Sequence, residues 1–199
     1  GYTYEVVAIG TQCWFAENLR SENYRNGDAI PGSLSDAAWV FTTTGAQTVY
    51  GEGSSEVGEG SDDEVANLAN YGRLYNWYAV DDARGLCPTG WHVPTDAEWT
   101  TLIDFLGGSD VAGIAMKSSP SDSPSWNGSN SSGFSALPGG YRNYYNGYFS
   151  NEGGNGSWWS SSPYGSLSAW GRNLASDYDS VSRNYSHRRV GLSVRCVRD

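Results

Sequence analysis

The pattern of hydrophobic and polar positions predicts a β-strand at the start of the chain. Residues 4–9 are rich in β-branched side chains and end at Gly10, which is typical of a strand that stops at a turn. Cys13, Trp14 and Phe15 continue the strand pattern. From residue 20 to residue 60 the pattern dissolves into Gly, Ser, Thr and acidic residues, which predicts loops and short elements without chemistry of their own.

Two helices are predicted in the middle of the chain. Leu74, Trp77 and Tyr78 stand at helical spacing and predict a helix over residues 74–80 that packs on a sheet. The second helix begins at Thr95, because Thr95 and Glu98 have the spacing of a capping box. It runs to about residue 106, where two glycines supply the left-handed conformation that ends a helix.

Short strands and long loops are predicted after residue 113. The candidate strands are residues 134–137, 157–161, 169–174, 181–185 and 191–197. The last of them alternates, so that Leu192, Val194 and Cys196 face inward and Ser193 and Arg195 face outward.

Composition supports one loop-rich domain over residues 1–199. Only 38% of the residues are hydrophobic and 17% are charged, while 26 are glycine. Nine Trp, fourteen Tyr and five Phe can still build a core, because each ring removes a large apolar area from water. The predicted fold class is therefore α+β, with two helices, short strands and long loops.

Charge and hydropathy exclude two classes of partner. The net charge is −10 and the acidic residues concentrate before Asp110, so a nucleic-acid backbone would be repelled. The longest apolar stretches fall far short of the roughly 18 to 20 residues that span a bilayer, so this segment is not expected to insert into a membrane.

Three cysteines allow one disulfide and one free thiol. Cys87 and Cys196 are the favoured pair, because both sit in stiff, aromatic-flanked segments and not in a CxxC metal spacing. The alternative of three buried, reduced thiols stays open. A disulfide would favour an extracellular or cell-surface location.

Six segments together resemble the Fibrobacter succinogenes major paralogous domain family. They are IGTQCWFAENL (9–19), YGRLYNWYA (71–79), CPTGWHVPTDAEW (87–99), GFSALPGGYR (133–142), WSSS (159–162) and GLSVRCVRD (191–199). This family resembles the formylglycine-generating-enzyme and C-type-lectin-like superfold. The resemblance implies a mixed, mostly antiparallel sheet with two helices and a large irregular excursion.

The same family supplies variable proteins of diversity-generating retroelements, which implies a binding region at about residues 159–191. In this region framework-like residues alternate with Tyr, Ser, Asn, Asp, His and Gly, the side chains that antibody paratopes use. The candidate ligand-binding residues are Tyr164, Gly165, Ser166, Gly171, Ser176, Tyr178, Asp179, Ser182, Asn184, Tyr185, Ser186 and His187. The expected ligand is an unknown protein or glycan on another cell or virus surface.

Two other functions remain as alternatives. A static carbohydrate-binding or adhesion domain could stack sugars on an aromatic set made of Tyr141, Tyr144, Tyr145, Tyr148, Trp158 and Trp159. Since Trp158 and Trp159 are adjacent in a predicted strand, they are expected to point to opposite sides, one into the core and the other beside the binding face. The other alternative is that residues 159–191 are an ordinary polar loop region of a static surface domain.

Catalysis is not expected. The formylglycine-generating relatives use a close pair of cysteines in the C-terminal region, where this chain has only Cys196. The two histidines, His92 and His187, sit in no recognisable catalytic arrangement, and we expect His92 to be structural. No cofactor is expected. A structural Ca²⁺ stays open because calcium is common in lectin-like folds, and no ligands are assigned to it.

Overall fold

A small antiparallel sheet joins the two ends of the chain. The computed structural model describes residues 2–58 and 60–199. Strands β1 (Val6–Ile9) and β2 (Gln12–Phe15) form a hairpin, with Gly10 at φ +60° in its turn. The sheet order is β1-β2-β12-β5, so β2 pairs with β12 (Val197–Arg198), which in turn pairs with β5 (Trp91–His92).

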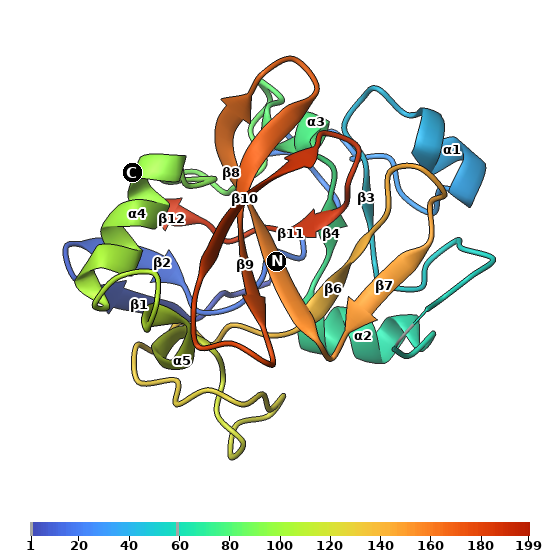
Figure 1. The fold of residues 1–199 in the computed structure, drawn as a ribbon. Helices are drawn as coiled ribbons and strands as arrows, with labels where there is room; N and C mark the ends of the chain where they lie inside the picture. Colours follow the sequence, from blue (N-terminus) through green and yellow to red (C-terminus); the bar gives the residue numbers. More distant parts are fainter. Residues whose placement is uncertain (1, 59) are drawn as a thin grey trace.

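A larger, eight-stranded sheet lies at the centre of the molecule (Figure 1). Its main path runs in the order β10-β9-β8-β11-β4-β3, and β6 and β7 join beside β8. The strands are β3 (Gln47–Thr48), β4 (Leu74–Tyr75), β6 (Gly139–Arg142), β7 (Phe149–Glu152), β8 (Asn155–Tyr164), β9 (Ser168–Ala175), β10 (Ser182–His187) and β11 (Leu192–Ser193). Most pairs are antiparallel, while β8 pairs in parallel with β6 and β11. The predicted α+β class is confirmed.

Five helices occur in the described ranges, and only α2 and α4 are longer than six residues. They are α1 (Asp36–Phe41), α2 (Glu64–Tyr71), α3 (Trp77–Val80), α4 (Asp96–Phe105) and α5 (Ala112–Met116). Helix α2 was not predicted. Asp63 precedes its first turn as the N-cap, because the Asp63 carboxylate accepts a hydrogen bond from the Ala66 amide.

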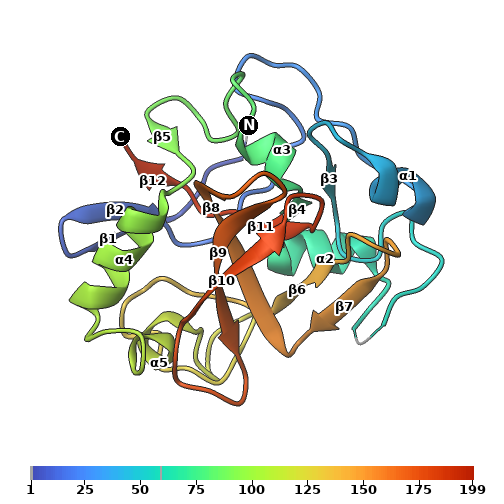
Figure 2. The ribbon, with the colours of Figure 1, turned by 45° about the horizontal axis from the view of Figure 1, so that its top comes forward.

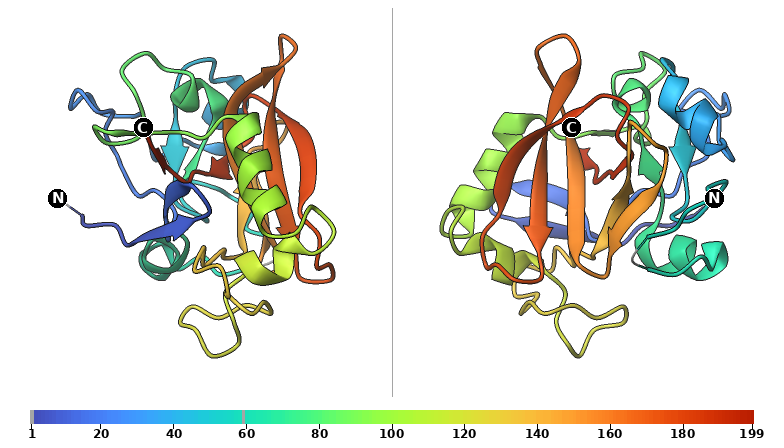
Figure 3. Two further views of the ribbon diagram at one scale, coloured as in Figure 1. Left: turned by 90° about the vertical axis from the view of Figure 1, so that its left-hand side faces the viewer. Right: turned by 45° about the vertical axis from the view of Figure 1, so that its right-hand side comes forward.

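Helix α4 confirms the predicted capping box. The Thr95 hydroxyl accepts a hydrogen bond from the Glu98 amide at 3.2 Å, and Glu98 accepts one from the Thr95 amide at 2.8 Å. Gly107 and Gly108 follow the helix with positive φ. Trp99 is fully buried and donates from Nε1 to the Trp159 carbonyl, so α4 packs against β8, as the left view of Figure 3 shows.

Two predicted elements are wrong in part. Leu74 and Tyr75 are not helical, because their backbones pair with β3 and β11, and only Trp77–Val80 forms a helix. The expected strand at 134–137 is reduced to a single bridge at Ala136, because Ser135 has a left-handed backbone at φ +52°.

The expected alternation of the last strand is also wrong. Ser193 is 1% exposed and Arg195 is 0% exposed, although both were expected to face solvent. Residues 194–196 interrupt the strand between β11 and β12. The buried Arg195 guanidinium donates to the side chain of Asn18 at 2.7 Å and to backbone carbonyls, which explains how a charged group is accommodated there.

Two aromatic-rich cores lie on opposite sides of β8. Trp158 packs in the cluster with Trp99 beneath α4, and Trp159 packs in the cluster that contains Tyr75. Both tryptophans are 0% exposed, so neither borders a binding face as an exposed ring. The second cluster also contains the predicted Cys87–Cys196 disulfide, which is present with a Cα–Cα distance of 6.1 Å.

The third cysteine, Cys13, is free and partly exposed.

No helix in the ranges 2–58 and 60–199 is long and apolar enough to cross a membrane. Figure 2 shows the small sheet that contains β12 beside the N-terminal half of α4.

Candidate functional site

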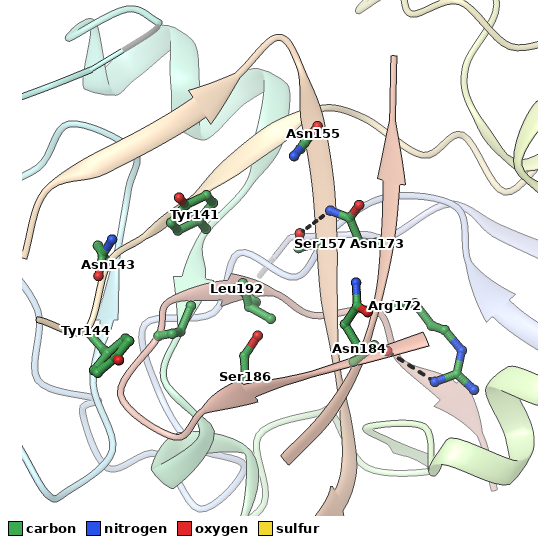
Figure 4. A pocket seen from close by; sticks show the side chains of 12 residues that line it. Tyr141, Asn143, Tyr144, Asn155, Ser157, Arg172, Asn173, Asn184, Ser186 and Leu192 are labelled. Atoms are coloured by element: carbon green, nitrogen blue, oxygen red, sulfur yellow. Dashed lines mark hydrogen bonds between the residues drawn. The ribbon is translucent and has the colours of Figure 1, made fainter. Parts of the chain in front are cut away.

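A solvent-open pocket lies on the face of the larger sheet that is turned away from α4. Its volume is about 300 Å³. We call it the sheet pocket, and it is lined by Tyr141, Asn143, Tyr144, Asn155, Ser157, Gly171, Arg172, Asn173, Asn184, Ser186, Val190 and Leu192. Figure 4 shows two walls, one formed by the β6 segment with its tyrosines and the other by β8, β9 and β10.

Strand register places the polar side chains in the second wall. Asn184 of β10 lies opposite Gly171 of β9, and Asn173 lies opposite Ser157 of β8. Because paired residues in an antiparallel ladder point to the same face, these positions all turn toward the pocket. Gly171 is closely packed between them, since a Cβ there would lie 2.7 Å from the Trp158 carbonyl oxygen.

Several polar groups of the pocket have no hydrogen-bond partner among the described residues. The Asn173 side-chain amide donates to the Ser157 hydroxyl at 2.9 Å, so this pair is engaged. Across the residues that the structure describes, the amides of Asn155 and Asn184 and the hydroxyl of Ser186 make no hydrogen bond. Figure 4 shows Asn184 and Ser186 directed toward the middle of the pocket. These groups are available to a ligand.

The tyrosine wall is held in place by ring stacking. Tyr144 stacks on the His187 imidazole with centroids 4.5 Å apart and an interplanar angle of 7°. Burial, and after it the nearby Arg189 guanidinium, lower the pKa of His187, so the neutral imidazole dominates at neutral pH. Tyr141 packs against the core cluster that contains Leu192.

The pocket carries no net charge. The one charged residue in its lining is Arg172, and its guanidinium is directed to the α4 side, where it donates to Asp96 at 2.7 Å and to Thr100 at 3.2 Å. Burial would raise the pKa of Asp96, but hydrogen bonds from Arg183 and Arg172 outweigh burial and lower it. The Arg172 guanidinium is therefore paired on the α4 side of the sheet and is not directed into the pocket.

A second aromatic group lies on the α4 side of the larger sheet, opposite the sheet pocket. Tyr164 and Tyr185 stack with centroids 4.2 Å apart. The Arg183 guanidinium lies 3.5 Å from the centre of the Trp170 ring, and it also forms an ion pair with Asp96 at 2.8 Å. This surface, which we call the hairpin patch, is separated from the sheet pocket by the thickness of the sheet.

The twelve candidate residues do not gather at one place. Gly171, Asn184 and Ser186 line the sheet pocket, and His187 contacts its rim through Tyr144. Gly171 contributes a buried backbone position and no side chain.

The remaining candidates lie elsewhere. Tyr164 and Tyr185 belong to the hairpin patch, with Gly165 and Ser166 exposed in the turn between β8 and β9. Ser182 is exposed at the start of β10.

The other three lie in the loop between β9 and β10. Tyr178 and Asp179 are exposed, whereas the Ser176 hydroxyl is engaged, since it accepts from Trp126 Nε1 at 2.9 Å and donates to the Gly154 carbonyl at 3.0 Å. Ser176 therefore anchors the loop.

Comparison with known proteins identifies the family. The family model described as the Fibrobacter succinogenes major domain matches residues 7–198. The chain belongs to this family. No curated protein and no solved structure matches the chain.

Sequence reasoning on this family domain missed part of the pocket. Asn143, Asn155, Ser157 and Asn173 were not predicted as ligand contacts. Tyr141 and Tyr144 were noted only as possible stacking rings. The available signal was the density of Asn and Tyr in residues 141–148, but the strand register that brings this segment opposite β10 is not readable from local sequence.

His92 lies outside the pocket and is held between two carboxylates. Its Nδ1 is 2.7 Å from Asp199 Oδ1, and its Nε2 is 2.9 Å from Glu98 Oε1. Burial lowers the pKa of His92, but the two carboxylate hydrogen bonds outweigh burial and raise it. This arrangement ties the last strand to the start of α4. Within residues 2–58 and 60–199, no group of three His, Cys, Asp or Glu side chains is placed to hold a metal ion.

Proposed function

We propose that this family domain is a non-catalytic recognition module that binds its ligand in the sheet pocket. The observation that carries the proposal is the set of uncommitted polar groups on Asn155, Asn184 and Ser186, which line the same pocket as the apolar side chains of Val190 and Leu192. A concave site with an apolar lining and a few convergent polar groups is the usual form of a small-ligand site.

The composition of the lining supports binding over catalysis. Amide and hydroxyl side chains orient a ligand through hydrogen bonds but do not ionise near neutral pH, so on their own they are poor general acids and bases. A nucleophilic serine needs a neighbouring base. Among the described lining residues, neither Ser157 nor Ser186 has an imidazole or carboxylate beside its hydroxyl.

The Cys87–Cys196 disulfide supports an extracellular or cell-surface location. Structural disulfides form and persist mainly in oxidising compartments. A recognition module on a cell surface would meet ligands on other cells or in the surrounding medium.

A diversified binding surface on a C-type-lectin-like scaffold is the second candidate. Tyr178, Ser182 and Tyr185 are exposed in a loop and along the edge strand β10, where different side chains can be accommodated at little cost in stability. Sequences of sibling copies test this candidate. Variation concentrated at these positions, with Gly171 unchanged because a side chain would meet the Trp158 carbonyl, would support it. Variation spread evenly over the surface would remove it.

Amide NMR chemical shifts test the pocket itself. The labelled domain is titrated with a panel of neutral sugars, amino acids, nucleosides and short peptides. The proposal predicts that at least one class shifts the amides of Gly171, Asn184 and Ser186. If every shift instead gathers on the hairpin patch, around Tyr164 and Tyr185, or if no class perturbs the pocket, the proposed function is refuted.

A further inference from the structure

We infer that the sheet pocket takes a neutral saccharide unit and binds it without a metal ion. This inference rests on the proposed function and adds the chemical class of the ligand.

The charges around the sheet pocket argue against a charged ligand. Arg172 is turned away toward Asp96, and the lining has no carboxylate. A phosphate, sulfate or carboxylate group would find no cation inside the pocket, and the chain's net charge of −10 would repel it. A metal-bridged ligand would need oxygen ligands of higher charge than amides and hydroxyls alone provide. The pocket therefore suits a neutral ligand.

The polar groups match a ligand that both donates and accepts hydrogen bonds. Each of the amides of Asn155 and Asn184 offers two donors and one acceptor, and the Ser186 hydroxyl offers both functions. Neighbouring hydroxyls on a sugar ring present donors and acceptors in the same alternating way. An apolar ligand would leave these groups unpaired at a cost of about 1–3 kcal/mol each once water is excluded.

The aromatic wall and the apolar lining suit the C–H face of a sugar ring. Tyr144 is fixed by its stack on His187, so its ring is presented without a large loss of side-chain entropy on binding. Val190 and Leu192 supply the apolar, buried part of the lining. The same pocket thus offers a sugar ring both apolar contact and hydrogen bonds.

The pocket volume limits the ligand to a small unit. About 300 Å³ is at the lower end of the roughly 300–1,000 Å³ that small-molecule sites span. Because the pocket opens to solvent, we expect one terminal sugar residue to enter while the rest of a glycan chain stays outside. A peptide would be expected to pair its backbone with the free edge of β10 instead.

The test combines a glycan array with monosaccharide titrations. The array carries neutral, sialylated and sulfated glycans and is probed in the presence of EDTA. Neutral hexoses, N-acetylhexosamines, fucose and xylose are then titrated to roughly 10 mM, which detects binding weaker than the 1 mM that corresponds to about −4 kcal/mol. We expect EDTA-resistant binding to at least one neutral sugar.

Two pairs of variants locate the binding. Asn184→Ala removes a free amide from the pocket, and Asn70→Ala removes an exposed amide from α2 as its control. Tyr144→Ala removes the ring wall, and Phe105→Ala removes a ring that is 64% exposed at the end of α4, on the other side of the sheet. We expect the two pocket variants to weaken binding roughly tenfold or more, as the loss of one or two hydrogen bonds or a stacked ring implies, and the two controls to change it less than about twofold.

The outcomes separate the inference from the proposed function. Binding only to sialylated or sulfated glycans, binding abolished by EDTA, or equal effects of Asn184→Ala and Asn70→Ala would each overturn the saccharide inference. If sugars do not shift the pocket amides but peptides or nucleosides do, the inference fails and the proposed function stands. If no class reaches the pocket, both fail.

Discussion

Replacing Arg195 by methionine tests the most unexpected feature of the core. The side chain is 0% exposed and makes four hydrogen bonds: to the Asn18 side chain at 2.7 Å, to the Phe15 and Phe134 carbonyls, and to the Ser135 carbonyl at 2.8 Å. These partners come from segments far apart in the sequence. Arg195 therefore fastens the N-terminal hairpin to the loop that follows α5.

The expected cost follows from these partners. Hydrogen bonds to a charged group contribute about 1.5–3 kcal/mol each, and desolvation of the buried guanidinium offsets part of their sum. Methionine would fill the volume but would leave the carbonyls buried without a donor. We therefore expect the free energy of unfolding to fall by about 4 kcal/mol, and the melting temperature to fall by roughly 8–16 °C for a domain of this size.

Urea denaturation and thermal unfolding of both proteins measure this cost. Arg198→Met is the matched control, because Arg198 lies three residues further along and is exposed; losing its contact with the Trp91 ring at 5.7 Å should change the stability by less than about 1 kcal/mol. If Arg195→Met loses less than about 1 kcal/mol at an unchanged m-value, or if it is more stable, the reasoning about this buried cation is refuted.

Three further predictions concern stability and backbone geometry. Replacing Cys87 and Cys196 by alanine opens a loop of 109 residues and should cost about 4–5 kcal/mol in calorimetry, whereas Cys13→Ala should cost far less; equal effects would contradict this. Since the folded-state pKa of His92 is raised, its stabilisation is complete below the unfolded value of about 6.5 and is lost as the pH rises through the folded value, so a pH series should show this loss in the wild type and not in His92→Gln. Gly171→Ala should destabilise the sheet by about 1–3 kcal/mol in urea melts, because its Cβ would lie 2.7 Å from a backbone oxygen; a neutral effect would show that the strand yields easily.

Local signals in the sequence predicted the elements whose stabilising groups are close together in the chain. The capping box of Thr95 and Glu98 needs only three residues of separation, and it is present in the structure. Leu74 stands at helical spacing with Trp77 and Tyr78 as well, but the pairing of Leu74 and Tyr75 with strands near residues 47 and 192 overrides that preference. Prediction from local helix propensity failed where pairing with strands far away in the sequence decides the structure.

The pocket, too, could be predicted only where local sequence carries the signal. Asn184 and Ser186, which line the pocket, were among the predicted contacts because a segment rich in Asn, Ser and Tyr is typical of binding surfaces. Their neighbour Asn155 was missed, since only the pairing of β8, β9 and β10 brings it to the same face. Arg195 was expected to face solvent because alternation was extended through residues 191–197, whereas carbonyls from residues 15, 134 and 135 converge on it.

A crystal structure of the domain grown with an array-selected neutral oligosaccharide tests the central claim most directly. The account predicts one ordered sugar residue in the sheet pocket, hydrogen-bonded to Asn184 and lying against Tyr144 above Leu192. An ordered ligand on the hairpin patch, against Tyr164 and Tyr185, with the sheet pocket holding only water, would contradict it.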